Sequence, residues 1–135
     1  MKPAYLVDTD WIIDHLNGKE TVRQKLKELR PSGISISIIS LAELYEGVYY
    51  SNDPVKSQSI LEGLLVQFDI AVIDEETCKI FGKERGKLRQ EGRIIGDFDL
   101  MIASTCLRRK LTLLTNNRKH FERLNDLKII SFSNR

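Results

Sequence analysis

The sequence predicts an α/β protein, a three-layer α/β/α sandwich whose central, mainly parallel sheet has about five strands. Two observations lead to this prediction. Short β-branched segments alternate with longer amphipathic segments along the chain, and no internal repeat, low-complexity tract or long linker interrupts them. At 135 residues the chain has the length of one ordinary domain, so we expect residues 1–135 to form a single unit.

The elements of the first half are predicted from apolar patterns that end at turn residues. Strands are expected at residues 4–8 and 34–39, and helices at residues 11–16, 21–29 and 55–68. Another helix begins at Ser40-Leu41-Ala42-Glu43, which matches a capping box, and continues to Tyr49. An apolar stripe predicts that the 55–68 helix packs against it as an αα-hairpin; the stripe comprises Ile60, Leu61, Leu64, Leu65 and Phe68.

The second half continues the same alternation. Strands are expected at residues 70–73, 111–115 and 128–132, and helices at residues 75–90, 100–109 and 119–124. Residues 92–96 form a loop, and Asp99 leads from it into the next helix. In a sheet of this kind, ligands bind outside the carboxyl ends of the strands, so the polar residues after each strand form the candidate site.

Composition indicates a soluble, cytoplasmic protein that is not embedded in a membrane. Hydrophobic residues make up 41% of the chain and charged residues 30%. The longest apolar tract, residues 64–73, is interrupted by Gln67 and Asp69 and cannot span a bilayer, and residues 1–10 do not form a signal peptide. Cys78 and Cys106 lack metal-ligand spacing, so we expect reduced core residues in a reducing cytosol.

Two of the candidate site residues have both a structural and a functional interpretation. Asp8 follows the first strand and is either a metal ligand, with the Thr9 hydroxyl orienting it or contacting substrate, or part of a helix N-cap. Glu43 is either the capping-box glutamate that turns back to its own helix terminus or a metal ligand in the first helical turn. We assign Asp10 to the first turn of the first helix, where a negative charge suits the helix dipole.

The other candidates lie in the second half of the chain. One of Asp97 and Asp99 can cap the helix that follows, but two like charges beside a buried helix favour a bound cation. We prefer Asp99 as a direct ligand and Asp97 as a secondary one. Thr115, Asn116 and Asn117 are either turn residues or site residues. In the second case Asn117 is a weak metal ligand, and Thr115 or Asn116 orients its neighbours.

Hard oxygen ligands select Mg²⁺ or Mn²⁺, and the chain offers no imidazole or thiolate spacing of the kind zinc prefers. His15 and His120 stand alone and are interpreted as structural. The net charge is +2, from 21 basic and 19 acidic residues, so the arrangement of charge matters more than its sum. Three basic clusters are either solvated faces or phosphate-binding surfaces: Lys79, Lys83, Arg85, Lys87, Arg89 and Arg93; Arg108 to Lys110; and Arg118 with Lys119.

Together these motifs resemble the PIN-domain ribonucleases, and most closely the VapC-type toxins of bacterial and archaeal toxin–antitoxin pairs. The resemblance rests on four segments: Asp8-Thr9; Ser40 to Leu44 with Glu43; Gly96 to Ala103 with Asp99; and Thr115-Asn116-Asn117 with Phe121. No single segment is specific, but the four occur in the family's order and cover nearly the whole chain.

The resemblance implies that Asp8, Glu43 and Asp99 are the catalytic acids of an endoribonuclease that uses Mg²⁺ or Mn²⁺ to hydrolyse phosphodiester bonds. Asn117 stands where many PIN domains have a fourth acid, which leaves the number of metal ions open. The family cleaves single-stranded or loop RNA, usually tRNA or rRNA, and so inhibits translation. Its toxins usually form homodimers and are neutralised by a VapB-type antitoxin whose tail enters the active site.

Two other functions are compatible with the same residues. A metal-dependent phosphohydrolase of small phosphate esters would use the same acids. A catalytically weak PIN-like module would bind RNA or protein through an incomplete metal site, as Asn117 permits. A further group of residues forms either ordinary core or an antitoxin groove: Tyr45, Val48, Tyr49, Tyr50 and the helix up to Phe68. Of these, Tyr45 and Val48 fit the core better.

Overall fold

Five strands form one sheet in the computed structural model, which describes residues 3–132. Their order is β3-β2-β1-β4-β5, and all neighbouring pairs run parallel. The strands are Tyr5–Val7 (β1), Ile34–Ser37 (β2), Asp69–Ala71 (β3), Thr112–Leu114 (β4) and Ile129–Ile130 (β5). The predicted sheet is confirmed, with each strand shorter than its sequence pattern. Residues 1–2 and 133–135 of the predicted domain lie outside the described residues.

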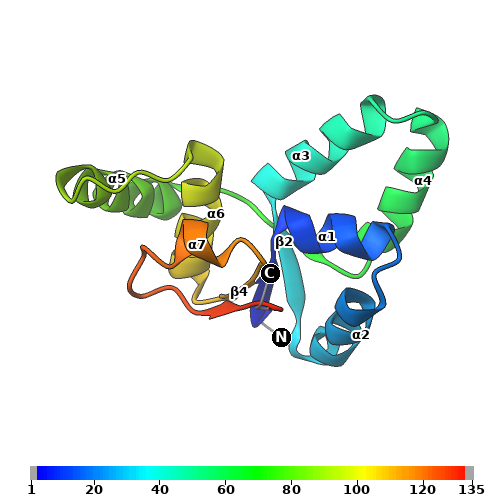
Figure 1. Ribbon diagram of the computed structural model, residues 1–135, viewed down its shortest axis with the longest axis horizontal. Helices are drawn as coiled ribbons and strands as arrows, with labels where there is room; N and C mark the ends of the chain where they lie inside the picture. Colours follow the sequence, from blue (N-terminus) through cyan, green and yellow to red (C-terminus); the bar gives the residue numbers. More distant parts are fainter. Residues whose placement is uncertain (1–2, 133–135) are drawn as a thin grey trace.

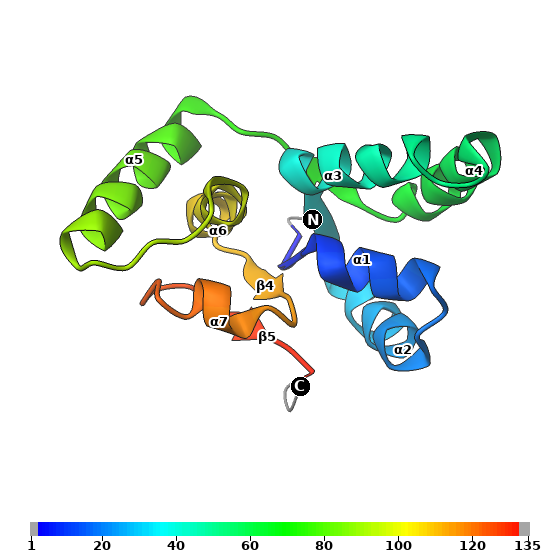
Figure 2. The same ribbon diagram turned by 45° about the horizontal axis from the view of Figure 1, so that its top comes forward.

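Helices cover both faces of the sheet, which gives the predicted three layers (Figures 1 and 2). One face carries Thr9–Leu16 (α1), Glu20–Leu29 (α2), Ile38–Tyr49 (α3) and Pro54–Leu65 (α4). The other carries Glu75–Gln90 (α5), Asp97–Arg109 (α6) and Arg118–Phe121 (α7). A short 3-10 helix, Arg30–Ser32 (η1), connects α2 to β2.

Side chains of the central strands alternate between two hydrophobic cores, as the pleat of a strand requires. Leu6 of β1 and Leu113 of β4 pack on the side of α5, α6 and α7. Val7 and Leu114, the next residues, pack on the side of α1 to α4. All four are fully buried, at 0% exposure. Since both faces are covered, β1 and β4 carry apolar residues at successive positions, and the polar residues Asp8 and Thr115 follow directly after them.

α3 and α4 form the predicted αα-hairpin (Figure 1). Leu61 and Leu64 of α4 are buried in the core that also contains Val48 of α3. Tyr45 is partly buried against the same core, so these two α3 residues are core, as expected. Ile60, by contrast, is 51% exposed, so this member of the predicted stripe is not part of the buried core.

α3 begins three residues earlier than predicted. Its N-cap is Ser37, whose Oγ accepts a hydrogen bond from the backbone N–H of Ser40 at 2.9 Å. The predicted capping box at Ser40 to Glu43 is therefore wrong, and Glu43 lies in the second helical turn. The β-branched Ile38 and Ile39 favoured a strand, but the Ser37 hydroxyl ends the strand and starts the helix before them.

The two cysteines are not both in the core. Cys106 of α6 is buried, and burial raises the pKa of its thiol above the usual range. Cys78 is exposed on the outer side of α5, so the expectation for this residue is wrong. Both thiols are free. Within residues 3–132, none of the helices is long and apolar enough to cross a membrane.

Candidate active site

Asp8 lies at the carboxyl end of β1, in the middle of the sheet, and is the N-cap of α1. Its Oδ1 accepts a hydrogen bond from the backbone N–H of Thr9 at 2.8 Å. Its Oδ2 accepts one from the hydroxyl of Thr115, which follows the neighbouring strand β4, at 2.7 Å. Each carboxylate oxygen has two lone pairs, so these two bonds leave the carboxylate able to accept a further ligand.

The position of Asp8 is costly for a charged group. The residue is only 3% exposed. Its pKa is raised from the ordinary 3.8 to about 7, chiefly by burial and also by the charges of Asp10 and Asp99, although the hydrogen bonds from Thr115 and Thr9 act to lower it. Among residues 3–132, no lysine or arginine forms an ion pair with it. The fold thus holds a carboxylate whose charge would be stabilised by a cation.

Glu43 lies at the same edge of the sheet as Asp8 and is linked to it by a hydrogen bond with Thr9. The Thr9 hydroxyl donates a hydrogen bond to Glu43 Oε1 at 2.7 Å and lies 2.8 Å from the Ser40 hydroxyl. These contacts fasten α3 to the start of α1, directly beside Asp8. The Thr9 hydroxyl therefore orients Glu43, while the Thr9 backbone N–H orients Asp8.

Asp99 lies in the first turn of α6 and faces α7. Its Oδ2 is 3.0 Å from Nδ1 of His120, and the two form an ion pair when the imidazole is protonated. The charge of Asp99 also raises the pKa of Asp8, so the two carboxylates are within electrostatic reach. The sequence pattern indicated only a structural role for His120 and gave no signal of its contact with Asp99, because the two residues lie on different helices.

Asp97 is turned toward α5. Arg85 forms an ion pair with Asp97, and its guanidinium also lies over the ring of Phe81, 5.7 Å from the centroid. Gly96 is the N-cap of α6, and the two acids of its first turn make no capping bond through their side chains. Neither Asp97 nor Asp99 caps α6, so the alternative that was not preferred for them does not hold. Their charges instead lie near the positive end of the helix dipole.

Thr115, Asn116 and Asn117 have three different environments. The Thr115 hydroxyl donates to Asp8 and accepts the backbone N–H of Asn117 at 3.0 Å. The Asn116 Oδ1 accepts the indole N–H of Trp11 at 3.2 Å and the backbone N–H of Phe132 at 2.8 Å. The Asn117 side chain is exposed. Asn116 is thus an anchor for the loop, which the sequence pattern did not reveal.

Asp10 anchors the same loop from the other side. As expected, it lies in the first turn of α1. Its carboxylate accepts the backbone N–H of Trp11 at 2.8 Å and that of Asn116 at 2.9 Å, and burial raises its pKa. Its charge is felt at Asp8, where it raises the pKa. This clamp joins residues too far apart in the sequence for any local pattern to indicate it.

Of the predicted ligands, Asp8, Glu43 and Asp99 lie at one edge of the sheet, whereas Asp97 is turned toward Arg85 and Asn117 is exposed. Within the described part of the chain, no three His, Cys, Asp or Glu side chains lie close enough together to hold a metal ion. A threonine hydroxyl binds Glu43, an imidazole binds Asp99 and a guanidinium binds Asp97. The donor set itself fits a hard cation, because it offers carboxylate oxygens around the buried charge of Asp8.

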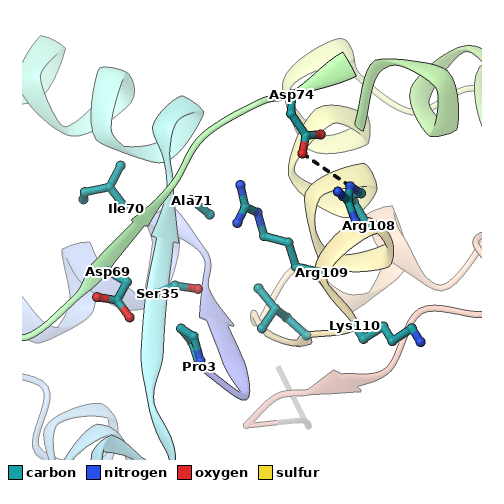
Figure 3. Close-up of a pocket in the computed structure, with 10 residues that line it drawn as sticks. Pro3, Ser35, Asp69, Ile70, Ala71, Asp74, Arg108, Arg109 and Lys110 are labelled. Carbon is teal, nitrogen blue, oxygen red and sulfur yellow. Dashed lines mark ion pairs between the residues drawn. The ribbon is translucent and has the colours of Figure 1, made fainter. Parts of the chain in front are cut away.

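A cleft of about 550 Å³ lies away from these acids (Figure 3). It is bordered by β2, β3 and the C-terminal end of α6, from which Arg109 extends into it and donates to the Val72 carbonyl at 2.8 Å. Arg108 forms an ion pair with Asp74 at 3.3 Å. Asp99 and Arg109 are ten residues apart on α6, about 15 Å along the helix axis. The cleft is therefore separate from the acidic site.

The PIN domain family model matches residues 5–127. The chain is also 30% identical to the tRNA(fMet)-specific endonuclease VapC of Shigella flexneri, over 96% of this chain and 98% of that protein. The chain belongs to the PIN-domain family, in its VapC branch. It is 36% identical to ribonuclease VapC1 of Methanocaldococcus jannaschii, over 90% of this chain and 81% of that protein.

A solved structure agrees with the assignment to the VapC-type PIN domains. The structure of VapBC2 from Rickettsia felis, bound to a DNA fragment from its promoter, is similar with a TM-score of 0.91 at 32% identity. The similarity covers 96% of this chain and 99% of that chain. Every acid described above lies within the matched fold, and the role of each in this PIN domain stays a prediction.

The buried charge of this PIN domain predicts that Asp8→Asn stabilises the protein at high pH. The folded protein keeps the Asp8 proton up to about pH 7, whereas the unfolded chain loses it near pH 3.8. Stability is therefore lost as the pH rises through this window. Without metal, the uncharged variant should be more stable than wild type by about 2–4 kcal/mol at pH 8 and similar to it near pH 4. Urea unfolding in EDTA measures both, and equal stability at pH 8 would contradict the buried charge.

The two neighbouring asparagines of this PIN domain should differ in their effect on stability. Asn116→Ala should lower the free energy of unfolding by about 1–3 kcal/mol, because the N–H groups of Trp11 and Phe132 lose their acceptor. Asn117→Ala, the matched control, should change it by less than about 0.5 kcal/mol, because its side chain is exposed. Urea unfolding at pH 7 compares them, and equal effects would show that Asn116 is not an anchor.

Proposed function

We propose that this VapC-type PIN domain is a Mg²⁺- or Mn²⁺-dependent endoribonuclease toxin. One observation carries the proposal: the buried carboxylate of Asp8 has no ion-pair partner among residues 3–132, and Asp99 and Glu43 lie at the same edge. The printed names of the relatives, ribonuclease and tRNA-specific endonuclease, support RNA as the substrate. We expect a tRNA or rRNA target, so that cleavage inhibits translation.

Asp8, Asp99 and Glu43 would hold the ion, Glu43 directly or through water. The Asp8 carboxylate keeps lone pairs beyond its two hydrogen bonds. Asp99 would exchange its exposed contact with an imidazole for the ion. Asp97 and Asn117 are weaker candidates, since a guanidinium engages the first and the second offers an exposed, uncharged amide.

The mechanism depends on how the chain positions these acids. When bound, Mg²⁺ or Mn²⁺ supplies a Lewis acid for the phosphate and lowers the pKa of the attacking water. Thr9 and Thr115 fix the orientation of the Asp8 carboxylate, and the Thr9 hydroxyl fixes Glu43. These acids are thus held in place before the substrate arrives, which reduces reorganisation during the reaction. The N-terminal end of α6, beside Asp99, favours a phosphate group there.

The antitoxin is proposed to bind a groove that leads to these acids. The similar structure from Rickettsia felis is a VapBC complex, which supports a VapB-type partner. In this chain a groove of about 290 Å³ lies between α1, α3 and α4, and Glu43 is one of its lining residues. An amphipathic segment fits an apolar groove of this kind. Most of the lining is apolar: Ile13, Leu16, Leu44, Val48, Ile60 and Leu61.

Two further features are proposed from the resemblance to VapC-type toxins. The first is a homodimer, which light scattering of the purified chain measures directly. The second is a cytoplasmic location, where both the RNA substrate and the antitoxin would be available.

Asp8→Asn and Asp99→Asn should each slow RNA cleavage by about a hundredfold or more, because each removes a charged ligand worth several kcal/mol to the transition state. Antitoxin-free wild type and variants would be incubated with total cellular RNA in EDTA, Mg²⁺ or Mn²⁺. We expect discrete fragments that require both the metal and Asp8. A second readout is thermal unfolding, in which the ion should stabilise wild type but not Asp8→Asn.

Each other outcome of this experiment selects a different function. Undiminished cleavage by a well-folded Asp99→Asn protein would contradict the proposed site. Binding of RNA without cleavage in either metal would favour the catalytically weak module. Release of phosphate from a generic ester, with RNA untouched, would favour the small-ester phosphohydrolase.

Ile60→Arg should weaken binding of the VapB-type antitoxin by about tenfold or more, because it places a charge in the apolar groove. RNA cleavage by the free protein should be unchanged. Val66→Arg is the matched control, since Val66 follows α4 and is 84% exposed. Titration of each variant with antitoxin measures the affinities, and equal affinities would place the antitoxin elsewhere.

A further inference from the structure

Phe98 is an exposed aromatic residue within the proposed active site. It lies in the first turn of α6, between Asp97 and Asp99, and is 59% exposed. The residues that follow it on α6 are buried, among them Leu100 at 1%. An aromatic ring gains free energy when it is buried, so this exposed ring is available to contact a ligand that binds beside the acids.

Three arginine side chains lie near the first turn of α6, the turn that carries Phe98, on the side of α5. Arg85, Arg89 and Arg93 line one small hollow together with Ile94 and Leu100. Arg85 is held in place, because its guanidinium lies over the Phe81 ring and pairs with Asp97. This pair also neutralises a carboxylate that would otherwise repel a phosphate near Phe98. Arg89 and Arg93 form no ion pair among residues 3–132 and are exposed.

The loop that carries this group is fixed to the rest of the fold. The backbone N–H of Arg93 donates to the Leu88 carbonyl at 2.8 Å. The Arg123 guanidinium donates to the Ile94 carbonyl, which ties the loop to the segment after α7. The arginines and Phe98 therefore stand on a supported rim of the site, which favours binding without a large ordering cost.

A single exposed ring on a helical turn that has several guanidinium groups nearby fits a nucleobase better than a protein surface. Unpaired bases stack on aromatic side chains, and arginines bind the phosphates that connect them. A protein interface of ordinary size instead buries about 800 Å² on each partner and has a contiguous apolar centre. The surface near the first turn of α6 combines one exposed ring with positively charged side chains, as sites for single-stranded RNA do.

We propose that Phe98 stacks on an unpaired base of the RNA substrate next to the bond that is cut, with Arg89 and Arg93 binding the adjacent phosphates. This inference rests on the proposed ribonuclease function and deepens it. Because a base in a duplex already stacks on its neighbours, the contact requires a single-stranded or looped segment at this position. Phe98 is thus a residue that selects unpaired RNA.

The test is steady-state cleavage of a short single-stranded RNA that contains a cut site mapped with wild type. Phe98→Ala and Phe98→Leu should raise KM about 5- to 150-fold with little change in kcat, because stacking is lost. Phe98→Tyr and Phe98→Trp should restore a KM near that of wild type, since each provides a ring. Tyr50→Ala is the control, because Tyr50 is 86% exposed on the opposite layer between α3 and α4.

Three results would overturn the inference. A wild-type KM for Phe98→Ala would show that the ring does not bind substrate, and a wild-type KM for Phe98→Leu would show that stacking is not the interaction. A change in the mass of Phe98→Ala by light scattering would assign the ring to a protein interface.

Failure of the proposed function is a separate result. If wild type does not cleave RNA, the stacking contact is still measured by fluorescence of Phe98→Trp. Its indole would be the exposed one, because Trp11, the single native tryptophan, is fully buried at 0% exposure. Quenching by single-stranded RNA, but not by the same RNA annealed to its complement, would support the inference. Absence of quenching would overturn it.

Discussion

The rest of the site depends on one constraint, the burial of the Asp8 carboxylate at the end of the central strand. β1 has neighbours on both sides, so Asp8 cannot turn to solvent and must find its partners in the fold. The start of α1 provides one N–H, and the segment after β4 provides the Thr115 hydroxyl. The remaining charge is uncompensated, which makes the edge of the sheet a place where a cation lowers the free energy.

The two halves of the site are held with different strengths. On the side of α1 and α3, Glu43 is bound by the partly buried hydroxyl of Thr9, and the anchors at Asp10 and Asn116 fix the neighbouring loop. On the side of α6, Asp99 is bound through an exposed ion pair, a contact typically worth about 1 kcal/mol or less. Rearrangement of the acids upon binding an ion or substrate is therefore easier on the side of α6.

The sequence patterns failed where two local signals competed. The capping-box spacing at Ser40 was correct in form, but the hydroxyl of Ser37 began α3 three residues earlier. The start of α6 was ambiguous in the same way, because Asp97 and Asp99 are both residue types that cap helices, although Gly96 is the N-cap. In each case the residue types were compatible with two starting points, and the packing of the helix against the sheet selected one.

The sequence by itself determined the parallel sheet, the order of its elements and the acids at the carboxyl ends of the strands. These features follow from hydrophobic periodicity, which is a local property of the chain. Only the tertiary structure decided which group each acid meets. Thr115 reaches Asp8 across 107 residues, and His120 reaches Asp99 across 21. Such partners are set by strand order and helix packing. A local sequence pattern cannot predict them, because it does not say which ends of different elements come together in the fold.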